Sequence, residues 1–152
     1  MSRALLCTAV LYCFAFTTQA QTPAQSQSMA KAILKNDVPA AEILLTVGVN
    51  PNTVIEVVPG FATNYLITAA SNNSLALVKL LLTYKAQVNQ PDAFKATALM
   101  AAVGKGNKAM VELLLASGAD ARAKDDDGKD ALALAKEGGN PEIIALLEQR
   151  LK

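Results

Sequence analysis

A run of three carboxylates, Asp125-Asp126-Asp127, stands directly before Gly128 and could in principle bind a divalent cation. Calcium loops of the EF-hand type place oxygen ligands at their first and twelfth positions around a central glycine. With Gly128 as that glycine, these two positions hold Ala123 and Leu134, which have no side-chain oxygen. The run is therefore predicted to form a turn, and no metal or other cofactor is expected.

The segment Gly104-Lys105-Gly106-Asn107-Lys108 superficially resembles a phosphate-binding loop. A Walker loop needs the spacing G-x-x-x-x-G-K-[ST] between a strand and a helix. This segment has a different spacing and lies between two expected helices. The corresponding positions elsewhere in the chain hold Ser71-Asn72-Asn73 and Glu137-Gly138-Gly139, so a turn between helices is predicted.

Catalytic chemistry has few candidate residues. The sequence contains no histidine, and its two cysteines, Cys7 and Cys13, lie in a segment expected to be removed. A histidine base, a His/Cys zinc site and a thiol nucleophile are thereby excluded. A carboxylate pair within residues 125–130 would lie on an exposed hairpin, where no burial raises a pKa. We predict a non-catalytic protein; the alternative is a small metal-dependent hydrolase that uses this acidic hairpin.

The N-terminus has the layout of a secretory signal peptide. Arg3 provides a positive start, Ala4 to Phe16 form an apolar stretch, and Thr18 and Ala20 place small residues before a cleavage site. The stretch is shorter than the ~20 residues that span a bilayer. Residues 1–20 are predicted to be cleaved between Ala20 and Gln21, and an uncleaved anchor is the alternative.

Cleavage would leave a neutral chain. Arg3 is one of the 14 basic residues, so its loss leaves 13 against 13 acidic residues. Zero net charge gives no bulk attraction to nucleic acid or to an anionic membrane, and neither is an expected partner. No further long apolar stretch follows, and we expect a monomer. Residues 21–27 are polar and lack periodicity, which predicts a short disordered leader.

The remaining chain is repetitive, with a period of 33 residues. The segments at 64–70, 97–103 and 130–136 superimpose without gaps, as do three leucine-rich segments. Each unit predicts two short helices, because Asn64, Thr97 and Asp130 are good N-caps for the first helix. Asn73, Gly106 and Gly139 stand where a helix ends in a left-handed residue.

The second helix of each unit is predicted to supply the core. Its caps are Asp37, Ser74, Asn107 and Asn140, and its leucines recur at 80–82, 113–115 and 146–147. Alanines at 69, 102 and 135 keep the first helices thin. An earlier unit is predicted from Met29 to Asn36 and from Val38 to Val47, with four extra residues before the next unit.

These features resemble the ankyrin repeat, whose signature is Thr-Pro-Leu-His-x-Ala-Ala, a glycine turn, a leucine-rich helix and Gly-Ala-Asp. The resemblance covers about residues 27–152 and implies an all-α solenoid of four helix-turn-helix repeats with β-hairpin finger loops. The expected domain is 28–152, with repeats at about 28–59, 60–92, 93–125 and 126–152. Ile67, Met100 and Ala133 replace the histidine, and Lys85 replaces a helix-ending glycine.

The resemblance also implies that a partner protein binds the concave side, at the finger tips and the ends of the first helices. Two of the four aromatic residues outside the signal segment, Phe61 and Phe94, fall in the tip column. They are either binding anchors or a pair that packs the fingers together. The candidate partner-binding residues are Phe61, Asn72, Phe94, Lys95, Lys105, Asp126, Asp127, Lys129 and Glu137.

The four-residue insertion lies in the segment Thr53 to Gly60, which is apolar and β-branched and favours an extended ribbon. Such a ribbon, with Val54 to Val58 at its centre, could add a strand from a partner or make an apolar contact with it. Alternatively, it folds over the thin N-terminal repeat and seals its core.

A signal peptide before a cysteine-free ankyrin-like stack favours a non-catalytic interaction module that is periplasmic or secreted. A sharper alternative is an immunity or inhibitor protein that acts against a toxin or an enzyme. Export beyond the periplasm to a host is a third possibility.

Overall fold

A computed structural model describes residues 22–152 as eight helices and one two-stranded sheet. The signal peptide predicted over 1–20 and Gln21 lie outside the described residues. The elements are α1 (Pro23–Leu34), α2 (Val38–Thr46), β1 (Val54–Val58), β2 (Phe61–Asn64), α3 (Tyr65–Ser71), α4 (Leu75–Thr83), α5 (Ala98–Gly104), α6 (Lys108–Ala116), α7 (Ala131–Gly138) and α8 (Pro141–Leu151). Within residues 22–152, no helix has the length and apolar character needed to cross a bilayer.

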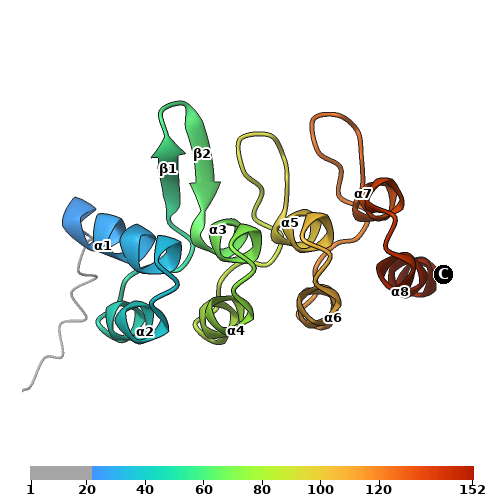
Figure 1. The fold of residues 1–152 in the computed structure, drawn as a ribbon. Coiled ribbons are helices and arrows are strands. Elements are labelled where there is room, and N and C mark those ends of the chain that lie inside the picture. Colours follow the sequence, from blue (N-terminus) through green and yellow to red (C-terminus); the bar gives the residue numbers. More distant parts are fainter. Residues whose placement is uncertain (1–21) are drawn as a thin grey trace, which may run out of the picture.

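The helices form two rows, as Figure 1 shows. One row contains α1, α3, α5 and α7, and each of these helices packs against the next. The other row contains α2, α4, α6 and α8 and is built in the same way. Loops project from the first row on the side away from the second (Figure 1). The predicted solenoid of helix pairs with finger loops is confirmed.

The prediction of a disordered leader is wrong for residues 23–27, because α1 begins at Pro23 rather than at Met29. Thr22 is its N-cap and forms a capping box with Gln25, and Pro23 occupies a first-turn position where its missing N–H is not needed. The hydroxyl of the fully buried Tyr65 also donates to the carbonyl of Ser26 at 3.0 Å. This contact with the next repeat holds the polar start of the helix.

The predicted caps are confirmed. Asn64, Thr97 and Asp130 each accept a hydrogen bond from the backbone N–H three residues later. The caps of the second helices do the same, at Asp37, Ser74, Asn107 and Asn140. Left-handed residues end the first helices at Asn36, Asn73, Gly106 and Gly139, with φ between 56° and 67°. Lys85 also adopts φ 67°, where Gly48 and Gly118 stand in the neighbouring repeats.

The core runs along the interface between the two rows. Leu81, Leu114 and Leu147 occupy equivalent places in α4, α6 and α8 and have no exposed surface. Ala69 and Ala102 are also fully buried, which lets successive first helices approach closely. The packing expected from the leucine and alanine columns is confirmed.

Two asparagines join successive repeats on the side of the second helices. The Asn52 side chain accepts from the Gln87 N–H at 2.6 Å and donates to the Lys85 carbonyl at 3.4 Å. Asn89 repeats the arrangement one unit later, with the Asp120 N–H at 2.8 Å and the Gly118 carbonyl at 3.0 Å. These bonds satisfy backbone groups just beyond the ends of α4 and α6 and link neighbouring repeats.

The segment with the insertion forms the strand pair β1–β2, which confirms the predicted extended ribbon. The pairing is antiparallel, with an irregularity between Glu56 and Val58. Ile55 points inward and belongs to the core, whereas Val54, Val57 and Val58 remain exposed. The ribbon therefore contributes to sealing the core through one residue and leaves an apolar surface on the others.

Candidate functional site

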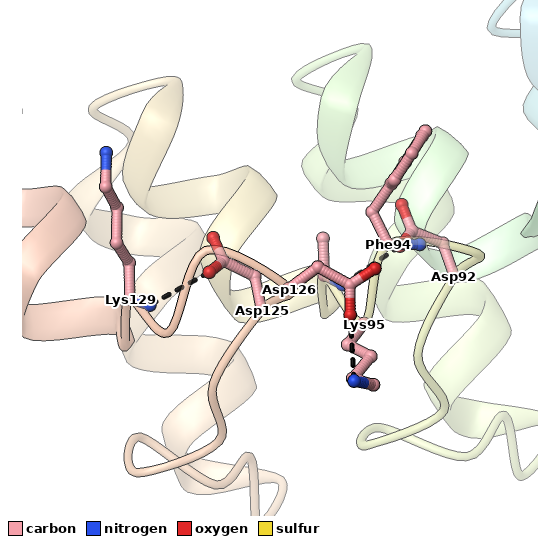
Figure 2. A network of polar contacts seen from close by, with 7 residues as sticks. Asp92, Phe94, Lys95, Asp125, Asp126 and Lys129 are labelled. Atoms are coloured by element: carbon pink, nitrogen blue, oxygen red, sulfur yellow. Dashed lines mark hydrogen bonds and ion pairs between the residues drawn. The ribbon is translucent and has the colours of Figure 1, made fainter.

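Three fingers rise beside the first helices: the first is residues 54–64, the second 92–96 and the third 125–129. The second finger closes with the Asp92 carboxylate, which accepts from the N–H groups of Phe94 and Ala96 at 2.9 Å each. In the third finger, Asp125 accepts from the Lys129 N–H at 2.9 Å (Figure 2). Gly128 has φ 75° at its turn. The prediction that the acidic run forms a turn is confirmed.

The fingers are bonded to one another. The Ala93 N–H donates to the Ala62 carbonyl at 2.9 Å, which joins the first finger to the second. The Asp126 N–H donates to the Phe94 carbonyl at 3.0 Å, which joins the second to the third. Lys95 and Asp126 form an ion pair of 2.8 Å across the same gap (Figure 2). The hydrogen bond and the charge of Asp126 raise the pKa of Lys95 above its ordinary value.

Phe61 and Phe94 pack against each other across the first two fingers. Their ring centroids are 5.3 Å apart and the ring planes are tilted by 32°. This separation lies in the range of favourable aromatic pairs. Phe94 nevertheless keeps 56% of its surface exposed. The pair therefore links the fingers and still offers ring surface to solvent.

The predicted helix-end residues have different surroundings. The Asn72 side chain donates to the Ile33 carbonyl at 3.3 Å and thus caps the end of α1. Glu137 is paired with Lys129 at 2.8 Å, and the pKa of Lys129 is raised mainly by the hydrogen bond to Glu137. Lys105 is exposed at the end of α5. This column is a polar rim rather than a single cluster.

An open groove of about 560 Å³ lies between the fingers and the first helices. Its residues come from α1, the first finger, α3, the second finger, α5, the third finger and α7. Leu34, Val57, Val58, Phe61, Thr63, Ile67, Thr68, Ser71, Asn72, Asp92, Ala96, Met100, Ala101, Asp125 and Leu134 line it. The lining is largely apolar, and its size is that of a ligand-binding site.

Of the predicted site residues, Phe61 and Asn72 line the groove. Phe94, Asp126 and Asp127 instead line a smaller depression of about 150 Å³ at the finger tips. The charged residues at 95, 105, 129 and 137 line neither of these two hollows.

Sequence reasoning missed most of the groove floor. Ile67 and Met100 lie there, at the positions where the repeat signature has histidine, and so do Thr63 and Asp92. Asp92 could have been found, because it stands 33 residues before Asp125 in the repeat register. Nothing in the sequence pattern singled out Thr63.

The paired helices, the projecting fingers and the 33-residue register define a repeat solenoid. The family model for ankyrin repeats, in three copies, matches residues 29–125 and 66–150. The chain belongs to the ankyrin-repeat family. A search of curated proteins found no match.

Ankyrin repeats are protein–protein interaction modules and are typically non-catalytic. In this chain, two carboxylates of the acidic finger have structural partners: Asp125 closes its own turn and Asp126 pairs with Lys95. The groove and its rim are therefore the candidate surface for binding a partner protein.

Proposed function

We propose that this chain is an exported bacterial interaction module that binds a partner protein in the groove between its fingers and first helices. The observation that carries the proposal is the open apolar groove together with the exposed Phe94 and the exposed valines of β1. Apolar patches of this kind, edged by polar residues, are typical of interaction sites. The polar edge consists of the helix-end residues Asn72, Lys105 and Glu137 together with the paired charges at positions 95, 126 and 129.

Export to the periplasm is part of the proposal, and the position of the first helix supports it. Cleavage between Ala20 and Gln21 would leave one residue before Thr22, which caps α1. The Thr22 hydroxyl accepts from the Gln25 N–H at 3.3 Å, and the Gln25 side chain accepts from the Thr22 N–H at 2.9 Å. The proposed cut therefore spares the capping box and every helix described in residues 22–152.

Export is tested by intact-mass measurement of the protein recovered from the periplasmic fraction. We expect a single species that begins at Gln21. Recovery of the full-length chain from the cytoplasm would overturn this part of the proposal.

Binding is tested by capture from periplasmic extract with tagged protein and two matched double variants. The groove variant is Val57→Thr with Val58→Thr, which preserves side-chain shape and β-branching while removing apolar surface. The control is Ile43→Thr with Val47→Thr, which removes exposed apolar surface from α2 and its C-cap in the other row of helices.

We expect the groove variant to bind the captured partner with roughly tenfold lower affinity, a change that corresponds to about 1.4 kcal/mol. The control should retain capture, and both variants should keep their helical circular dichroism. Loss of capture in the control alone would place the binding surface on the second row of helices and refute the proposed site.

A further inference from the structure

The charges of the groove are all of one sign. Its lining contains two charged residues, Asp92 and Asp125, and no lysine or arginine. They stand one repeat apart, in the second and third fingers. Two rim lysines are engaged, Lys95 with Asp126 and Lys129 with Glu137, and the exposed Lys105 does not line the groove. Neither Lys95 nor Lys129 forms an ion pair with Asp92 or Asp125, although the charge of Asp125 contributes to the raised pKa of Lys129.

In each of these carboxylates, one oxygen accepts backbone hydrogen bonds within its finger and the other accepts none. The Oδ1 atom of Asp92 accepts two backbone hydrogen bonds, and the Oδ1 atom of Asp125 accepts one. Among residues 22–152, no hydrogen bond or ion pair reaches the Oδ2 atom of either. An ionised carboxylate can accept at both oxygens and forms its strongest hydrogen bonds with cationic donors.

Thr63 supplies an independent sign that the groove is incomplete. Its side chain lines the groove and is only 3% exposed, yet its Oγ1 atom has no hydrogen-bond partner in the described chain. A buried hydroxyl without a partner costs free energy. Because Thr63 lines the groove, the backbone of a bound segment could supply the missing partner of this hydroxyl.

We propose that the groove binds a segment of the partner protein that presents a lysine or arginine flanked by apolar side chains. The cation pairs with the Oδ2 atoms of Asp92 and Asp125, and the apolar neighbours pack on Val57, Phe61 and Leu134. The Thr63 hydroxyl bonds to the backbone of the segment. This inference rests on the proposed function, because it specifies the chemistry of the partner at the same site.

The probe is a phage-displayed library of random linear dodecapeptides, selected on the immobilised protein. We expect enrichment of peptides with a central lysine or arginine between apolar residues. Synthetic copies should bind more weakly as the salt concentration rises, because the proposed pair is electrostatic. Enrichment of acidic or uncharged peptides, or of no family of peptides, would overturn the inference.

Variants then locate the cation. Asp92→Asn with Asp125→Asn keeps the Oδ1 acceptors that close the fingers and removes two negative charges. We expect about a tenfold loss of affinity for the basic peptide. The matched control, Glu42→Gln with Glu112→Gln, removes the same charge from exposed positions on α2 and α6, outside the groove. Equal losses in both double variants would mean that only the overall charge matters and would refute the site.

Thr63→Val tests the hydroxyl with a side chain of similar shape. We expect unfolding of the free protein to be unchanged or shifted to a higher temperature, and peptide affinity to fall severalfold. Unchanged affinity would remove Thr63 from the site.

If the double variant Asp92→Asn with Asp125→Asn still captures the partner protein, the cationic segment is refuted and the proposed function remains intact. Failure of the unaltered protein to capture any partner would count against the proposed function itself.

Discussion

The contact between Phe61 and Phe94 makes a quantitative prediction about the fingers. The rings are 5.3 Å apart, and such pairs contribute about 0.5–1.5 kcal/mol beyond the surface they bury. Phe94 is 56% exposed, so it realises a little under half of the ~1.5–3 kcal/mol that full burial provides. We therefore expect Phe94→Ala to lower the free energy of unfolding by about 2 kcal/mol.

The assay is a double-mutant cycle in which Phe61→Ala, Phe94→Ala and the double variant are unfolded with urea and followed by circular dichroism. The double variant should lose less stability than the sum of the two single variants, by about 0.5–1.5 kcal/mol. The melting temperature should fall by roughly 2–4 °C for each kcal/mol lost. Additive effects within about 0.3–0.5 kcal/mol would show that the rings do not interact.

Capture of the partner by the same preparations separates a structural role from a binding role. Phe61 lines the groove and Phe94 remains half exposed, so we expect the double variant to lose capture even far below its melting temperature. If capture persists below that temperature, the rings serve only to join the fingers. The exposed face of β1 would then be the next candidate for the binding surface.

Three further perturbations test the stack. Leu114→Ala should lower the free energy of unfolding, measured with urea, by about 2–5 kcal/mol, because Leu114 has no exposed surface. Leu151→Ala at the half-buried end of α8 should lower it much less. Equal denaturation midpoints for the two variants would contradict the repeat register. Lys85→Gly should raise the melting temperature, because backbone with φ 67° costs a residue that has a Cβ about 1–2 kcal/mol, which glycine avoids. A lower melting temperature would contradict this reasoning. The pKa of Lys95 is raised, so its pair with Asp126 stabilises the fold fully below pH 10.5, and this stabilisation is lost as the pH rises through the higher folded-state pKa. The melting temperature of Lys95→Met should therefore fall less steeply at alkaline pH than that of the unaltered protein. An identical alkaline profile would exclude a contribution from the pair.

The sequence determined the repeat architecture because each signal is local and recurs. An N-cap such as Thr97 needs only the backbone N–H three residues later, and a left-handed end such as Asn73 is set by its own φ. The leucine and alanine columns repeat with the same spacing, so the buried face of each helix could be identified without coordinates.

The start of α1 shows where this local reasoning failed. Residues 23–27 are polar and show no helical periodicity, yet they are helical. Short helices are only marginally stable by themselves. The bond from the Tyr65 hydroxyl to Ser26 joins residues that are 39 positions apart, and no local pattern reveals such a contact.

The period of 33 residues, the caps and the helix pairs followed from the sequence itself, since each depends on neighbouring residues or on simple repetition. The groove, the ring pair and the unpaired hydroxyl of Thr63 were decided only by the tertiary structure. They bring together side chains from different repeats, and their distances depend on how neighbouring repeats are placed against one another. Hydrogen bonds and ring contacts act over a few ångströms, so the placement of neighbouring repeats fixes whether Asp92 and Asp125 face one ligand.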